Sequence, residues 1–213
     1  MKKPIFAAIL FCVTALAFGD IFDHPLTDES KSVFQKISQS IASHKVQKGD
    51  FTQTKFISKL KRELSSSGSC IISREDGIMW QTKKPFPSTM IVSASSVVQI
   101  SSSGKKSVLQ AEGNATFESF AKVIGSVFQG GEELSEKNFD IFFEGSEKAW
   151  SVGLIPREKS IRTIADRFLL QGGEALTSVT MHEKNGDFIR YEFANLSFPA
   201  TLTDDEKAFF EKQ

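Results

Sequence analysis

The sequence has few cysteines and few histidines, which limits the chemistry available to it. It contains two cysteines, Cys12 and Cys70, and three histidines among 213 residues. Because Cys12 lies in the apolar N-terminal stretch, Cys70 would be the one cysteine of a processed chain, and an intramolecular disulfide is then excluded. His24, His44 and His182 are far apart and show no spacing typical of a metal site. We therefore expect no metal and no other cofactor.

An excess of charge of either sign is also missing. The 26 basic and 26 acidic residues cancel, so the protein as a whole produces no field that would attract nucleic acid or an anionic membrane. Basic residues nevertheless gather at predicted strand ends and turns, where they usually point into solvent and protect strand edges. Since these turns alternate along one predicted sheet, the alternative is that they share a rim and form a docking patch. The clusters are Lys55 with Lys59, Lys61 and Arg62, then Lys83 with Lys84, and Lys105 with Lys106.

Long apolar runs are absent except at the N-terminus. There, two lysines precede an apolar run from Pro4 to Phe18, and Ala17-Phe18-Gly19 suits cleavage before Asp20. The run is shorter than the roughly 20 residues that a membrane-spanning helix needs. The large Phe11 precedes Cys12, which does not fit a lipidation site. We therefore expect residues 1–19 to be a cleaved signal peptide, residues 20–213 to form one domain, and the protein to be exported.

The spacing of apolar residues predicts an α+β fold. Helical spacing occurs over residues 32–45 and again over 116–129, where Gly130-Gly131 ends the second helix. Between and after these helices, short runs rich in β-branched and aromatic residues are separated by turn residues, and Asn185-Gly186 predicts a tight hairpin. We predict a curved antiparallel sheet with the helices covering one opening. The predicted strands are 49–57, 69–75, 77–82, 88–95, 97–103, 138–145, 149–156, 166–173 and the two arms of 176–198.

Tyrosine and tryptophan are scarce, and this bears on the interior. The chain has 20 phenylalanines but one tyrosine and two tryptophans. A buried Tyr or Trp usually needs a hydrogen-bond partner, whereas Phe needs none. The bias fits an ordinary packed core and also fits a cavity that binds apolar chains, and composition does not separate the two.

Motifs for catalysis are weak. Ser58-x-x-Lys61 matches the Ser-x-x-Lys of penicillin-binding enzymes, and the same spacing recurs at Ser102 and Ser103. The companion Ser-Asp-Asn and Lys-Thr-Gly elements do not accompany it. A pattern this common in a chain rich in Ser and Lys carries little information, so we expect no enzymatic activity.

Several short motifs occur in a fixed order along the chain. Residues 49–53 read GDFTQ, Gly68 begins a stretch that ends at Arg74, Trp80 lies six residues after Arg74, and Pro85 lies five residues after Trp80. MIVS at 90–93 and WSVGLIP at 150–156 follow. This ordered set resembles the periplasmic outer-membrane lipoprotein carrier family (LolA-like). The stretch FTQTKFISKLKRELSSSG, with Lys84-Pro85-Phe86, is similar to a divergent branch of that family associated with aryl-polyene lipid gene clusters.

The resemblance implies an incomplete β-barrel with a helical lid over an apolar cavity for the acyl chains of lipoproteins or a related lipid. It implies a periplasmic carrier that is a monomer and not an enzyme. Its expected partners are an inner-membrane releasing complex and an outer-membrane acceptor, with no role for nucleic acid. Arg74 matches the family's arginine that ties a strand to the lid, so the resemblance makes it a latch.

Lipid contacts are expected from both the strands and the helices. Ile78 and Trp80 should share one face of their strand and Met79 the other, although an error of one residue in register exchanges the two faces. The alternative function is a binding or scaffold module on the same fold whose interior is packed shut. The residues expected to line the cavity are Phe51, Trp80, Met90, Val92 and Ile100 from the strands and Phe34, Ile37, Phe117, Phe120 and Val127 from the helices.

Overall fold

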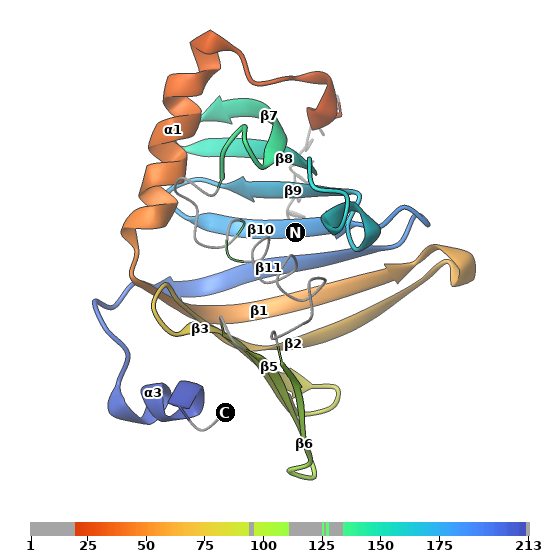
Figure 1. The fold of residues 1–213 in the computed structure, drawn as a ribbon, viewed down its shortest axis with the longest axis vertical. Coiled ribbons are helices and arrows are strands. Elements are labelled where there is room, and N and C mark those ends of the chain that lie inside the picture. The colour runs from red at the N-terminus through yellow and green to blue at the C-terminus, as the bar shows by residue number, and fades with distance from the viewer. Residues whose placement is uncertain (1–19, 94–95, 111–124, 126, 128–133, 212–213) are drawn as a thin grey trace, which may run out of the picture.

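A computed structural model describes residues 20–93, 96–110, 125, 127 and 134–211 (Figure 1). These residues form one curved, unclosed antiparallel sheet of eleven strands in the order β6-β5-β4-β3-β2-β1-β11-β10-β9-β8-β7. The predicted α+β class and incomplete barrel are confirmed. The strands are β1 (Val46–Ile57), β2 (Arg62–Ser73), β3 (Gly77–Lys84), β4 (Ser88–Val92), β5 (Ser96–Ser101), β6 (Lys106–Gln110), β7 (Phe139–Ser146), β8 (Ala149–Pro156), β9 (Arg167–Gly172), β10 (Leu176–His182) and β11 (Phe188–Ser197).

Two meanders make up this sheet. Strands β1 to β6 form the first and β7 to β11 the second, and each strand pairs with its neighbour in the chain. The pairing of β1 with β11 joins the meanders and places Phe51 directly opposite Phe193. Short turns of 3-10 helix lie outside the strands, at Ile21–Asp23 (η1), Ser58–Leu60 (η2) and Ile161–Thr163 (η4).

The buried side of helix α1 (Asp28–Ser43) packs against one face of the sheet. Thr27 accepts a hydrogen bond from the Ser30 N–H, and the Ser30 hydroxyl accepts one from the Thr27 N–H, so a capping box begins the helix. The sequence predicted a start at residue 32, four residues late, because the cap consists of polar residues outside the apolar repeat. The buried side of the helix carries Phe34, Ile37 and Ile41.

The second predicted helix lies largely outside the described residues. Gly125 and Val127 are helical, and Val127 is fully buried. Phe117 and Phe120 lie outside the described part of the chain. Within that part, no helix is long and apolar enough to cross a membrane.

Helix α3 (Asp204–Glu211) lies against the opposite face of the sheet from α1 (Figure 1). The Glu206 carboxylate accepts a hydrogen bond from the Thr203 N–H at the start of the helix and one from Lys48 of β1 at 2.6 Å. Leu202 and Phe210 pack on apolar side chains of β1 to β5. The helix therefore buries apolar surface that one layer of sheet would leave in water.

Cys70 of β2 is buried, which makes stability sensitive to alkaline pH. Burial, with a smaller contribution from Asp50, raises the pKa of the thiol to about 12 from a usual value of 9.0. A group whose pKa is raised by folding stabilises the fold below its unfolded pKa and loses that contribution as the pH rises. Between about pH 9 and pH 11, the unfolding free energy of the wild type should fall about 2 kcal/mol further than that of Cys70→Ala. Urea unfolding at both pH values measures the difference, and equal losses would contradict it.

Candidate functional site

The sheet has two faces with separate apolar clusters. We call the face covered by α1 the inner face and the face covered by α3 the outer face. The outer cluster contains Val46, Ile71, Met79, Ile91, Val98, Leu202 and Phe210. The inner cluster is larger and continuous across both meanders, and includes Phe34, Ile37 and Ile41 of α1 together with Cys70, Ile72, Ile78, Phe139, Ile141, Phe143, Trp150, Val152, Leu154, Phe168, Leu170 and Val179.

Most of the residues predicted to line a cavity meet at the inner face. Met90 is partly buried against the inner cluster, and Trp80 lies directly opposite it across the β3 and β4 strands. The prediction that Ile78 and Trp80 share a face and that Met79 points the other way is confirmed. The predicted residues buried in the inner cluster are Phe34, Ile37, Phe51, Trp80, Val92 and Val127.

Ile100 lies apart from the other predicted residues. It packs against the outer cluster with Val98, while Val97 of the same strand packs against the inner one. Both faces of β5 carry aliphatic side chains because α3 covers the outer one. Alternation in the sequence therefore does not show which face is inner, and Ile100 is not part of the inner site.

Aromatic rings from three strands adjoin on the inner face. The ring of Tyr191 lies 6.1 Å from Phe51, 5.9 Å from Trp80 and 6.4 Å from Phe193, measured between centroids. Burial raises the pKa of the Tyr191 hydroxyl to about 12, so it stays protonated at neutral pH. Sequence reasoning predicted Phe51 and Trp80 here but missed Tyr191 and Phe193, although both lie on the alternating arm that follows the predicted hairpin.

A buried amide side chain also lies on the apolar inner face. Gln47 is buried and lies opposite Ile72, an inner-cluster residue, so it points to the same face. Among the described residues its amide Nε2 has no hydrogen-bond partner. A buried donor without an acceptor costs roughly 1 to 3 kcal/mol. Gln47 thus offers a donor to a carbonyl or hydroxyl of a molecule held at this face.

Arg74 connects the turn after β2 to the end of α1. Its N–H donates to the carbonyl of Lys45 at 3.0 Å, and its guanidinium Nη1 donates to the carbonyl of Ala42 in the last turn of α1. Carbonyls of a last helical turn lack partners within the helix and lie at the negative end of its dipole. The Arg74 side chain is exposed, so this contact is weaker than a buried one would be.

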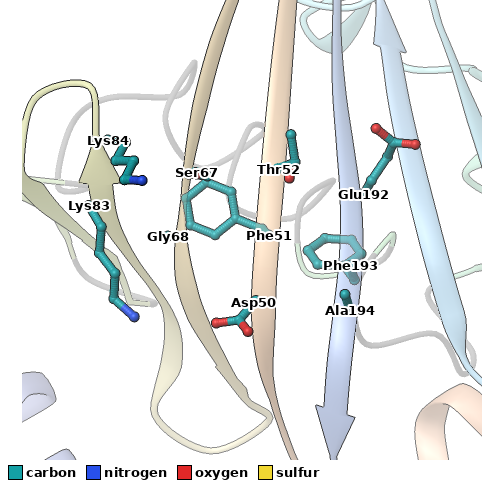
Figure 2. Close-up of a pocket in the computed structure, with 10 residues that line it drawn as sticks. All are labelled: Asp50, Phe51, Thr52, Ser67, Gly68, Lys83, Lys84, Glu192, Phe193 and Ala194. Carbon is teal, nitrogen blue, oxygen red and sulfur yellow. The ribbon is translucent and has the colours of Figure 1, made fainter.

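Two of the hollows among the described residues border Phe34 or Phe51 of the inner cluster. One, of about 500 Å³, lies along α1 and is lined by Phe34, Leu134 and Ile141, with the Lys31 to Glu136 ion pair at its border. The other, also about 500 Å³, is lined by residues of β1, β2, β3 and β11 (Figure 2). Figure 2 shows the ring of Phe51 against Gly68 of the neighbouring strand, with Lys83 and Lys84 on the strand beyond.

Groups suited to metal binding do not gather at either face. Across residues 20–93 and the other described segments, no group of three or more His, Cys, Asp or Glu side chains could hold a metal ion. The inner face offers apolar contacts, the amide donor of Gln47 and, at the end of α1, the contact from Arg74. Such a face suits binding of an apolar molecule.

Comparison with known proteins gives the family. A search of curated proteins finds no match to the sequence. Among solved structures, a DUF1329 family protein from Desulfovibrio piger is 12% identical with a TM-score of 0.45, covering 86% of this chain and 98% of that one. A LolA superfamily protein from Nitrosomonas europaea is 8% identical with a TM-score of 0.43, covering 83% and 96%. Residues 42–209 match the family model described as "Outer membrane lipoprotein carrier protein LolA", and the chain therefore belongs to the LolA family.

Proposed function

We propose that the protein is a periplasmic carrier that holds the acyl chains of lipoproteins, or of a related lipid, against the inner face. An inner-membrane releasing complex would load it, and an outer-membrane acceptor would unload it. The observation that carries the proposal is the continuous apolar inner face, covered by α1 and fastened at Arg74. Residues 1–19 would direct export and be removed, leaving residues 20–213 as the carrier domain.

Binding of an acyl chain at the inner face requires no catalysis. Burying a 16-carbon acyl chain contributes roughly 10 kcal/mol at about 0.8 kcal/mol per methylene, before the cost of ordering the chain. Gln47 would supply a donor for the ester or amide carbonyl next to the chain. Transfer would then depend on an acceptor that binds the cargo more tightly, with Arg74 as the contact that re-forms when the carrier closes.

Binding of an apolar fluorescent dye tests the carrier function. N-phenyl-1-naphthylamine should bind saturably, and palmitate or a lipopeptide should displace it. Met90→Gln places a polar group at the inner face and should weaken dye binding by about tenfold, since each buried methylene contributes about 0.8 kcal/mol. Ile100→Gln is the matched control, because Ile100 is a similar half-buried aliphatic residue on the outer face.

The outcome separates the carrier from the alternative. No saturable binding by the wild type would favour a binding or scaffold module with a packed interior. Equal loss of dye binding in Met90→Gln and Ile100→Gln would mean that the dye does not bind at the inner face. Native mass spectrometry of protein purified from its own periplasm would then identify any lipid that remains bound.

A further inference from the structure

The basic clusters of the sequence lie at one end of the sheet. In an antiparallel meander the hairpins β1–β2, β3–β4 and β5–β6 turn at the same end, and the turn that carries Arg74 lies at the other. Figure 1 shows α1 at one end of the strands and the β1–β2 hairpin at the opposite end. We call residues 55–64, 83–87 and 101–106 the tip rim.

Charge is strongly concentrated on the tip rim. It contains eight basic residues and one acidic residue, Glu63. The whole chain has no net charge, so the remainder of the protein carries an excess of negative charge. Within the described part of the chain, Lys59, Lys61, Lys83 and Lys84 take part in no ion pair. No paired carboxylate neutralises the charges of these four lysines, so they can interact with a binding partner.

Large apolar side chains project from the same hairpins. Phe86 is 80% exposed, Leu60 63% and Leu64 56%. Folding has left these three side chains in water although the protein buries apolar residues on both faces of its sheet. Large exposed apolar patches rimmed by polar residues mark interaction sites, and Phe86 is the most exposed of the large apolar side chains in the described part of the chain.

Hollows flank the basic β3–β4 hairpin on two sides. The hollow of Figure 2 is lined by Lys83 and Lys84, and a second one, of about 320 Å³, is lined by Lys83, Ser101 and Ser102. Lys83 borders both. The ammonium donors of Lys83 and Lys84 and the hydroxyl donors of Ser101 and Ser102 therefore border these hollows.

We propose that the tip rim is a docking surface for an anionic phospholipid membrane. Phe86, Leu60 and Leu64 would enter the boundary between headgroups and acyl chains, and the lysines would contact the phosphates. Seven of the eight basic residues are lysine, whereas protein interfaces are depleted in lysine and enriched in arginine. The excess negative charge elsewhere would orient the protein with the rim toward the membrane.

Docking of this kind does not depend on an open inner face. A protein with a packed interior would dock in the same way, so a failed dye-binding experiment leaves this inference standing. Conversely, a carrier that contacts only protein partners would bind the dye but would not bind vesicles.

Vesicle co-sedimentation tests the proposal. Purified protein should pellet with vesicles of phosphatidylglycerol and phosphatidylcholine in equal parts, but weakly with pure phosphatidylcholine, and binding should weaken between low salt and about 0.15 M salt. Lys83→Gln/Lys84→Gln should lower the partition coefficient roughly tenfold to thirtyfold, from about fivefold per lysine. Phe86→Ser should lower it about tenfold.

Matched variants away from the rim control for general effects. Lys45→Gln/Lys148→Gln removes two exposed lysines at the opposite end of the sheet, and Phe209→Ser removes an apolar side chain of α3 that is 45% exposed. Both control variants should bind vesicles like the wild type. All variants are produced with the same N-terminal residue. If the wild type does not bind anionic vesicles, or the control variants lose as much as the rim variants, the proposal is wrong. Rim variants that keep vesicle binding but lose binding to an acidic partner protein would also overturn it.

Discussion

Arg74→Leu should bind lipid about fivefold more tightly than the wild type and release it to an acceptor about fivefold more slowly, the factor that corresponds to one hydrogen bond of about 1 kcal/mol. The substitution removes the guanidinium that donates to the Ala42 carbonyl at the end of α1. Under the proposed function this contact belongs to the closed state. A loaded, open state loses nothing by the change. If the substitution destabilises the closed state, the binding free energy of a ligand that favours the open state becomes more favourable by the same amount.

Loading and release have to be measured separately for this variant. Transfer of a fluorescent lipopeptide to acceptor vesicles gives the release rate, and equilibrium titration gives the affinity. Arg74→Lys keeps a cation at the end of α1 and should restore part of the rate. Lys148→Leu, at an exposed turn of the same end of the sheet, is the control. Wild-type rates in Arg74→Leu would show that the contact has no part in release.

Gly68→Ala should have the largest effect on stability, a loss of about 4 kcal/mol or more in the free energy of unfolding. A Cβ atom at Gly68 would lie 2.0 Å from the carbonyl oxygen of Gln81 and 2.9 Å from the Cα of Thr82. Both are backbone atoms of β3, next to a shift in the β2 to β3 register. The backbone cannot move aside without breaking the ladder that holds Trp80.

Urea unfolding of Gly68→Ala measures this loss, with Gly104→Ala for comparison. Gly104 has a φ of +79° and open space around its Cα, so alanine there should cost about 1 to 2 kcal/mol from backbone strain alone. Equal stability of the two variants would mean that β2 and β3 can separate locally. That result would mean that the close approach of β3 does not explain why residue 68 is a glycine.

Local patterns predicted most of the strands because each carries its own apolar alternation. Helix α3 was missed because its sequence, DDEKAFFE, offers too few apolar positions to show a helical period. Its capping residues and the ion pair of Glu206 with Lys48 hold it, and the latter joins positions distant in the chain. Strand β6 was missed because KSVLQ is short and follows a glycine turn.

For the candidate site, the sequence could place residues on a common face but could not say which face was inner. Ile78 and Trp80 were paired correctly by their spacing, whereas Ile100 went to the outer face. Tyr191 approaches Phe51 and Trp80 through the pairing of β1 with β11, strands at opposite ends of the chain. No local signal encodes that register, so the aromatic cluster appears only in three dimensions.

The short link between α1 and β1 limits how far the helix can move from the sheet. His44 and Lys45 are the two residues between the last residue of the helix and the first of the strand, so the Cα atoms of Ser43 and Val46 are three steps apart and at most about 11 Å from each other. Near its other end, Leu26 donates to Ile141 of β7, and Phe143 donates to His24, both at 2.9 Å. Both ends of α1 are therefore tethered to the sheet. If the Arg74 contact is lost, these tethers should still keep α1 close to the sheet.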